Sequence, residues 1–272
     1  MEKNLTFLED MKKAFDAFKN TPKDELLFTY NGVMYPTAIC DTETFQTIET
    51  FEAREEDLMM VAYPKCGTNW TMLLLNGILD AAYKKEPAKV IPMIEFKAPN
   101  KFEMLVSFRN PKDTAVSLFN FYKNNPVLPT YNSWDDFFPD FMAGKVIWGS
   151  YFDHAVVWNK HIDKDTVLLK TFEDMKEDLK GSVEKICKFF GISITEEQVK
   201  QIAEKGTFKS MKENSEKTHG SLGQVVFRKG DVGDWKNYFS EAQSQEVDAK
   251  FEECLGGTKL GELLKYNVHC TW

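Results

Sequence analysis

The fold of this chain is decided by residues 59–70, MMVAYPKCGTNW. An apolar run from Met59 to Tyr63 stops at Pro64, and the residues after Trp70 have the apolar spacing of a helix, TMLLLNGILDAAYK. We therefore predict a strand, a tight turn and a helix, in that order.

The predicted turn has the properties of an anion-binding site. The first backbone N–H groups of a helix have no partner within the helix and lie at the positive end of its dipole. Together with the Lys65 ammonium group and the Thr68 hydroxyl, they suit a phosphate. The GxxxxGK[ST] loop of nucleotide triphosphatases is absent, because Lys65 precedes a single glycine and no Lys-Ser/Thr pair follows. From these residues alone, a phosphate site and an ordinary strand-to-helix turn remain equally open.

The composition is that of a globular protein with a large core. The chain has 272 residues, of which 43% are hydrophobic and 14% aromatic, and we expect one α/β domain spanning residues 1–272. Its net charge of −8 argues against a protein that coats nucleic acid, although a local cluster of Lys and Arg can still bind a small anion.

Cysteine usage and the N-terminal segment predict a cytoplasmic protein. The cysteines are odd in number and have no CxxC spacing, so we expect neither a disulfide framework nor a metal site: Cys40, Cys66, Cys187, Cys254 and Cys270. Residues 1–19 are amphipathic and contain acidic residues, unlike a secretory or transit peptide. No apolar run has the length needed to span a membrane, and we expect no membrane association.

Strand and helix patterns alternate along the rest of the chain. Apolar runs predict further strands at 102–108 and 166–172, and Asn31-Gly32 predicts the turn of a short hairpin or an extended crossing. Apolar spacing predicts helices over 5–19, 114–124, 134–141, 149–160, 173–190 and 196–205 and after Glu241, with a polar, mobile stretch at 210–226. Strands connected by helices form a parallel sheet with right-handed crossovers. The predicted fold class is therefore α/β, with a central parallel sheet flanked by helices.

Two basic segments and one histidine are candidates for function, each with a plainer interpretation. Arg109 follows the second strand, where ligands gather in parallel sheets, yet a surface arginine is the more common case. Arg228-Lys229 precedes Gly230, which permits close backbone approach to a phosphate, but such a pair is usually solvated surface. His154 lies among aromatic residues and is more often a packing residue than a catalyst.

Four segments in this order resemble the cytosolic sulfotransferases, which use 3′-phosphoadenosine 5′-phosphosulfate (PAPS). They are YPKCGTNW (63–70), FRNPKDTAVS (108–117), FEDMKED (172–178) and RKGDVGDWKNYF (228–239). The resemblance extends from about Phe28 to Phe251 and is greatest toward the family 6 sulfotransferases. It implies an α/β fold with a P-loop-like phosphosulfate-binding strand-turn-helix.

By this resemblance the 5′-phosphosulfate loop is 65–70. Lys65 would contact the bridging and leaving-group oxygens, Thr68 and Asn69 would hold phosphate, and Trp70 would stack beside the adenine. The remaining loop positions, Cys66 and Gly67, would contribute backbone only, since a thiol is a poor hydrogen-bond donor.

The opposite end of the implied site would bind the 3′-phosphate and the adenine. The resemblance assigns the 3′-phosphate to Arg109, Ser117, Arg228, Lys229 and Gly230. It assigns the adenine to Phe172, Thr207 and Phe208, where Phe172 replaces a tyrosine that is common in the family. The acceptor pocket would be lined by Leu118, Phe121, Val127 and His154, which implies a small, largely apolar acceptor with a hydroxyl or amine. Aromatic residues at helical spacing are equally consistent with core packing.

The implied reaction is sulfuryl transfer, with Lys65 as the catalytic residue and adenosine 3′,5′-bisphosphate (PAP) as product. The family uses a histidine as general base, in a segment between the phosphosulfate loop and the FRNPKD strand. In this chain Phe96 is followed directly by Lys97, and a few dozen residues of that region are missing by family comparison. None of the four histidines replaces the base by sequence position: His154, His161, His219 and His269.

Two explanations compete for the Phe96–Lys97 join: a genuine short form, such as a splice product, or an omitted segment. We favour an omitted segment, because the loss of a core strand would threaten a parallel sheet. The corresponding functional alternatives are an active sulfotransferase and a catalytically silent protein that binds PAP or PAPS. A triphosphate-dependent kinase is disfavoured, since the Walker-type Lys-Ser/Thr and a magnesium-holding acidic strand end are not both present.

The family's dimer motif, KxxxTVxxxE, is degenerate in this chain. Residues 236–245 read KNYFSEAQSQ, in which Glu241 replaces the valine and Gln245 the closing acid. We therefore expect a monomer or a different oligomer.

Overall fold

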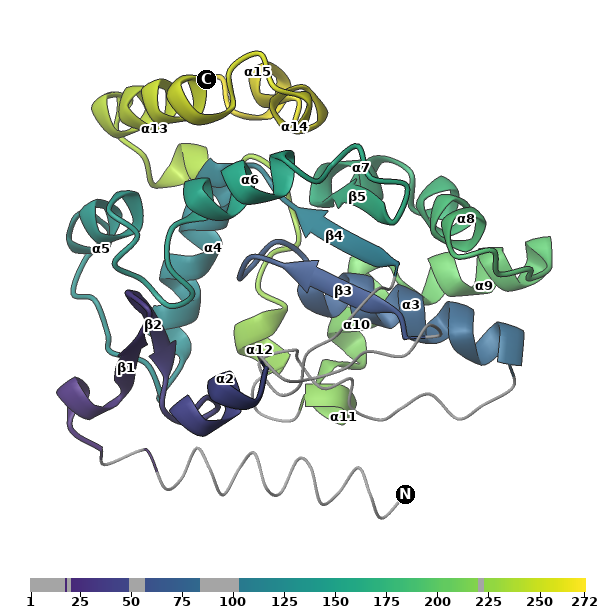
Figure 1. Ribbon diagram of the computed structural model, residues 1–272, viewed down its shortest axis with the longest axis horizontal. Coiled ribbons are helices and arrows are strands. Elements are labelled where there is room, and N and C mark those ends of the chain that lie inside the picture. The colour runs from purple at the N-terminus through teal and green to yellow at the C-terminus, as the bar shows by residue number, and fades with distance from the viewer. Residues whose placement is uncertain (1–17, 19–20, 49–56, 84–102, 220–222) are drawn as a thin grey trace.

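The computed structural model of the protein describes residues 18, 21–48, 57–83, 103–219 and 223–272 (Figure 1). The helix predicted over 5–19 falls outside these residues apart from Phe18, and the Phe96–Lys97 join lies outside them entirely.

A three-stranded parallel sheet, in the order β3-β4-β5, occupies the centre of the molecule (Figure 1). Its strands are β3 (Met59–Ala62), β4 (Met104–Phe108) and β5 (Val167–Thr171). Ala62 is aligned with Ser107 in the first pair, and Phe108 with Thr171 in the second, so the three strands end at one edge. The predicted parallel α/β sheet is confirmed for the described residues.

The predicted hairpin is also confirmed. Strands β1 (Leu27–Tyr30) and β2 (Val33–Pro36) pair antiparallel, and Asn31 and Gly32 between them have φ values of 48° and 80°. Two positive φ values are the geometry of the tight turn that Asn-Gly favours. Phe45 of α2 (Thr42–Ile48) stacks on Tyr30 with ring centres 5.1 Å apart, which holds the hairpin against this helix.

Side chains on the two faces of the sheet belong to two hydrophobic clusters. Successive β4 side chains point to opposite faces. Leu105 therefore packs with α3 (Thr68–Tyr83) and α8 (Leu179–Phe189), whereas Val106 packs with α4 (Pro111–Asn124) and α6 (Tyr151–Asn159). The remaining helices are η1 (Lys23–Glu25), α5 (Trp134–Met142), α7 (Phe172–Glu177), α9 (Glu196–Lys205), α10 (Phe208–Glu213), α11 (Ser215–His219), α12 (Gly223–Val226), η4 (Asp234–Asn237), α13 (Glu241–Leu255), α14 (Lys259–Leu263) and α15 (Tyr266–His269). The C-terminal helices α13, α14 and α15 form a layer at the top of Figure 1.

Two predicted helix boundaries and one predicted polar stretch differ from the structure for local reasons. The helix predicted over 173–190 is broken at Asp178, which leaves helical geometry and accepts a hydrogen bond from the Gly181 N–H to begin α8. The helix predicted over 114–124 begins three residues earlier at Pro111, since Asn110 is its N-cap. The stretch predicted to be mobile over 210–226 contains parts of α10, α11 and α12, and Thr207 caps α10.

Candidate functional site

Each strand of the parallel sheet leads directly into a helix at the same edge. Tyr63–Gly67 connects β3 to α3, Arg109-Asn110 connects β4 to α4, and Thr171 is both the end of β5 and the N-cap of α7. The aligned register brings these three junctions side by side. Ligands of open parallel sheets bind at this edge, outside the carboxyl ends of the strands.

The turn after β3 is held in an unusual backbone conformation. Lys65 has a φ of 70° and Gly67 a φ of 95°, and only glycine adopts such values without cost. The Ser107 hydroxyl of β4 donates to the Cys66 carbonyl at 2.9 Å, which ties the turn to the neighbouring strand. Strained backbone that is supported in this way is typical of a functional loop.

The Lys65 side chain is partly buried and its ammonium group has no ion pair or hydrogen bond to any described residue. It lies 4.5 Å from the ring centre of Phe121. Burial, followed by the positive charges of Arg109 and Arg228, lowers the pKa of Lys65 to about 8. A cation with no carboxylate partner beside two further cations is suited to an anionic ligand.

The Cys66 thiol is structural. It is fully buried, 3.6 Å from the Thr114 hydroxyl, and burial raises its pKa to about 12. It is therefore present as the neutral thiol.

Three residues predicted for the two ends of the site meet at one place. The rings of Trp70 and Phe172 are 5.1 Å apart and nearly perpendicular, and the Arg109 guanidinium lies 4.3 Å from the Phe172 ring centre. The Trp70 indole N–H is buried and has no partner among the described residues. These aromatic surfaces and the guanidinium come from three different junctions at the sheet edge.

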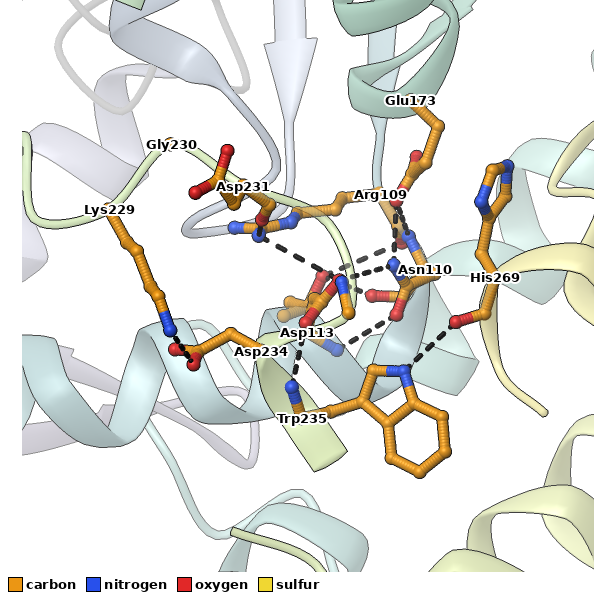
Figure 2. A network of polar contacts seen from close by, with 12 residues as sticks. Arg109, Asn110, Asp113, Glu173, Lys229, Gly230, Asp231, Asp234, Trp235 and His269 are labelled. Carbon is orange, nitrogen blue, oxygen red and sulfur yellow. Dashed lines mark hydrogen bonds and ion pairs between the residues drawn. The ribbon is translucent and has the colours of Figure 1, made fainter. Parts of the chain in front are cut away.

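The loop 227–233 brings a second set of cations to Arg109 (Figure 2). Arg109 donates from Nη2 to the Asp231 carbonyl at 2.8 Å. Arg228 and Lys229 both pair with the buried Asp234 carboxylate. Burial alone would raise the pKa of Asp234, but the hydrogen bonds from Lys229 and Arg228 outweigh it and lower the pKa to about 2. The basic pair is thus held by an acid at the start of η4, which follows the loop directly.

Gly230 has a φ of 68° and lies against Phe208, because a Cβ atom added at Gly230 would lie 2.1 Å from the Phe208 ring. Thr207 caps α10 by accepting a hydrogen bond from the Ser210 N–H. Phe208 therefore adjoins the basic loop, and only glycine fits at position 230.

Ser117 lies on α4, one helical turn after Asp113 and therefore on the same side of the helix. Asp113 is hydrogen-bonded to the loop that carries Arg228 and Lys229. Ser117 is thus on the side of α4 from which Asp113 bonds to Gly233 and Trp235.

The residues predicted to line an acceptor pocket have different environments. Phe121 is partly buried beneath the Lys65 ammonium group, whereas Leu118 and Val127 are buried. The His154 ring packs 5.7 Å from Tyr63 and 5.3 Å from Phe108, and burial lowers its pKa to about 4. Its Nε2 has no partner among the described residues. Phe121 and His154 therefore lie beside the turn that follows β3, while Leu118 is part of the core.

Several polar residues of the site were missed by sequence reasoning. Glu173 is buried and accepts from both the backbone and the side-chain amide of Asn110, at 3.0 and 2.7 Å. Burial raises the pKa of Glu173, and these hydrogen bonds partly oppose the rise. Lys176 holds the Gly230 carbonyl at 2.6 Å. These residues belong to the FEDMKED and FRNPKD segments, and that position in the sequence could have indicated that they lie at the site.

His219 lies at the site, although the sequence predicted it to be part of a polar, mobile stretch. Its Nε2 lies 3.3 Å from the Asn69 amide oxygen, and its ring packs against Phe227. An imidazole from α11 therefore contacts the first turn of α3. Burial lowers the pKa of His219, so the ring is neutral near pH 7.

The described part of the chain contains no group of three or more His, Cys, Asp or Glu side chains arranged to hold a metal ion. Within the same residues, no helix combines the length and apolar content required to cross a lipid bilayer.

Comparison with known proteins identifies the family. The model of the sulfotransferase domain matches residues 87–259. Human sulfotransferase 6B1 is 43% identical over 295 positions, covering 97% of both chains. Rat sulfotransferase 1C2 is 31% identical over 264 positions, covering 80% of this chain and 89% of the relative. The crystal structure of mouse sulfotransferase SULT7A1 complexed with PAP matches with a TM-score of 0.77 and 33% identity, covering 89% of this chain and 98% of that one.

The alignment with human sulfotransferase 6B1 is longer than the part of this chain that it covers. It extends over 295 positions, whereas 97% of 272 residues is about 264, so about 30 positions have no residue in this chain. The alignment nevertheless extends over 97% of both proteins. With the matched domain, the relatives and the α/β architecture in agreement, this chain belongs to the sulfotransferase family.

Proposed function

We propose that the chain binds PAPS at the β3-β4-β5 edge and transfers its sulfuryl group to a hydroxyl or amine of a small, largely apolar acceptor. The observation that carries this proposal is the convergence of cations from separate segments at one sheet edge. Arg109 lies against Phe172 and donates to the loop that carries Arg228, and after burial the charges of Arg109 and Arg228 lower the pKa of Lys65. A nucleotide with a phosphate at each end suits such an arrangement. The relative SULT7A1, of similar structure, is complexed with PAP.

The residues would act mainly through position and charge. Bound PAPS supplies a sulfuryl group on a phosphate leaving group; the acceptor oxygen or nitrogen bonds to sulfur while the sulfur–phosphate oxygen bond breaks. Lys65, whose ammonium group has no ion pair or hydrogen bond to the described residues, would stabilise the negative charge that develops on the departing phosphate. Trp70, Phe172 and Phe208 offer aromatic faces for the adenine, and Arg109, Ser117, Arg228, Lys229 and the Gly230 backbone would hold the 3′-phosphate.

The acceptor must lose a proton to a base during transfer. His154 is beside the turn but is enclosed by aromatic rings, and its low pKa makes it a weak base. A protein that binds PAP or PAPS without catalysing transfer is therefore a second candidate function. The alignment positions without a residue in this chain support the same alternative.

The deciding experiment begins with intact mass and peptide mapping across Phe96–Lys97. Protein of the verified 272-residue sequence is then titrated with PAP by calorimetry and assayed with sulfur-35 PAPS against phenols, steroids and amines. Saturable PAP binding that is lost in Arg228→Ala/Lys229→Ala supports the site, and label transfer supports the enzyme. Binding without transfer favours the silent protein, and the absence of PAP binding refutes both.

We also propose a single cytoplasmic domain that does not form the family-type dimer. Gln245 and Glu241, at the altered motif positions, are exposed and hydrogen-bonded to each other at 3.3 Å. Light scattering that gives the mass of a dimer, abolished by substitutions in residues 236–245, would contradict this proposal.

A further inference from the structure

The carboxylate of Asp113 connects two segments that are distant in sequence. It is buried, with 1% exposure, in the first turn of α4. Its Oδ2 accepts from the Gly233 backbone N–H at 2.7 Å and from the Asn110 side chain at 2.9 Å. Its Oδ1 accepts from the Trp235 backbone N–H at 3.0 Å. Figure 2 shows this carboxylate at the centre of the network, between α4 and the basic loop.

These contacts span the two halves of the proposed 3′-phosphate site. One half, Arg109, lies four residues before Asp113 at the end of β4, and its Nη2 is 4.0 Å from Asp113 Oδ2. The other half, Arg228–Gly230, lies three residues before Gly233, the first of the two residues whose N–H groups donate to Asp113. The same Arg109 nitrogen donates to the Asp231 carbonyl, so the guanidinium and the loop are in direct contact.

Asp113 is not suited to touch a bound phosphate. Both of its oxygens already accept hydrogen bonds from the chain, and a carboxylate repels a phosphate dianion. Its oxygens instead hold the chain in place, because a carboxylate that accepts from backbone N–H groups makes strong, short hydrogen bonds. Any effect on a nucleotide must therefore pass through Arg109 and the basic loop.

The loop end that Asp113 holds is fixed on its other side as well. The Trp235 side chain is fully buried, and its indole N–H donates to the His269 carbonyl at 2.9 Å. With Trp235 anchored in the C-terminal layer, the Asp113 contacts determine how far the basic loop lies from Arg109.

We propose that Asp113 is a positioning residue that sets the distance between Arg109 and the Arg228–Gly230 loop and so produces selectivity for nucleotides with a 3′-phosphate. This inference rests on the proposed function. Asp113 would set the geometry of the 3′-phosphate site, whereas Arg109 and the Arg228–Gly230 loop supply its positive charge. Two cationic segments bind one phosphate jointly only when their spacing matches it, and a shift of about 1 Å weakens such recognition by tenfold or more.

The test compares PAP with adenosine 5′-monophosphate, which lacks the 3′-phosphate. Their Kd values are measured by calorimetry for the wild-type chain and for Asp113→Asn. The amide is isosteric, but its NH₂ group faces a backbone N–H and disrupts one side of the network. We expect the preference for PAP over the monophosphate to fall by at least about tenfold, with the Kd of the monophosphate nearly unchanged.

A matched control is Asp174→Asn. Asp174 occupies the same third position of α7 that Asp113 occupies in α4, and its N–H is likewise bonded by the N-cap side chain. Its carboxylate pairs with Lys265 instead of the basic loop. The preference for PAP should be retained in this variant.

If Asp113→Asn does not fold, judged by circular dichroism, Gly233→Ala replaces it. A Cβ at Gly233 meets no atom within 4 Å, but its φ of 88° disfavours alanine and shifts the loop. A variant that weakens the binding of both nucleotides by the same factor, or the binding of neither, overturns the inference. A wild-type chain without a preference for PAP overturns the proposed function itself, so the two failures are distinguishable.

Discussion

The ammonium group of Lys112 donates a hydrogen bond of 2.7 Å to the carbonyl oxygen of Cys270, 158 residues further along the chain. Lys112 is fully buried and also bonds the Ser244 hydroxyl at 2.7 Å and the Asp248 carboxylate at 2.6 Å. The lysine of the FRNPKD segment is therefore a structural residue that joins α4 to the C-terminal helices. A buried lysine is stable only when its charge is paired and its donors are used.

We predict that Lys112→Met destabilises the protein by about 2 to 3 kcal/mol, because it leaves the Ser244 hydroxyl and the Cys270 carbonyl without their donor. Urea unfolding followed by circular dichroism measures this loss. Lys123→Met provides the control, since Lys123 lies at the exposed end of the same helix. Equal effects of the two substitutions would show that the buried contacts contribute nothing specific.

The low pKa of Lys65 predicts how PAP affinity depends on pH. In the free protein Lys65 loses its proton near pH 8, whereas an adjacent phosphate favours the charged form and raises its pKa in the complex. Affinity should be independent of this group below pH 8 and should fall above it, by up to about tenfold per pH unit.

Calorimetric titrations with PAP between pH 7 and 9.5 test this dependence. The arginine of Lys65→Arg stays charged throughout that range, so the PAP affinity of this variant should not decline with rising pH. If wild type and variant decline in parallel, Lys65 is not the titrating group.

His154 should make the folded protein sensitive to moderate acid. Burial lowers its pKa from 6.5 to about 4, so the unfolded state binds the proton more readily. The contribution of neutral His154 to stability is fully present above pH 6.5 and is lost as the pH falls through 4. The loss amounts to about 3 kcal/mol.

His154→Phe removes the titrating group and suits the neighbouring rings of Tyr63 and Phe108. The free energy of unfolding of this variant should depend less on pH between 6.5 and 4 than that of the wild type. Identical pH profiles would refute the assignment.

Asp234 should affect the stability of the folded protein at a lower pH than His154 does. Despite its burial, hydrogen bonds from Lys229 and Arg228 lower the pKa of Asp234 from 3.8 to about 2. Its contribution to stability is present above pH 3.8 and is lost as the pH falls toward 2, by about 2 kcal/mol. Asp234→Asn should be less stable at pH 6 but should lose less stability between pH 4 and 2. Thermal unfolding across that range measures the difference, and an unchanged acid profile would contradict it.

Much of the fold was predictable because it depends on local rules. The strand-turn-helix at 59–70 and the Asn31-Gly32 hairpin follow from side-chain periodicity and from the φ values that Asn and Gly tolerate. The break at Asp178 was missed because capping competes with a continuing apolar pattern. The helices within 210–226 were missed because a polar composition does not by itself exclude short capped helices.

Part of the candidate site was also predictable, since motif residues stand at strand ends. The positions of Lys65, Arg109 and Phe172 at one sheet edge follow from a parallel sheet whose strands are followed by helices. The contact between His219 and Asn69 was not predictable, because those residues are 150 positions apart and meet only through packing of α11 on α3.

The amino-acid sequence alone determines which chemical groups stand after each strand, because strand and helix periods and turn conformations are properties of neighbouring residues. The partners of those groups were decided only in three dimensions. Asp113 could have faced solvent on its helix, yet the packing of Trp235 under the C-terminal layer places two backbone N–H groups against its carboxylate. Lys65 remained without a carboxylate partner among the described residues, while Arg228 and Lys229 acquired Asp234. Burial and long-range packing, which no short segment encodes, set these pairings and the pKa values that follow from them.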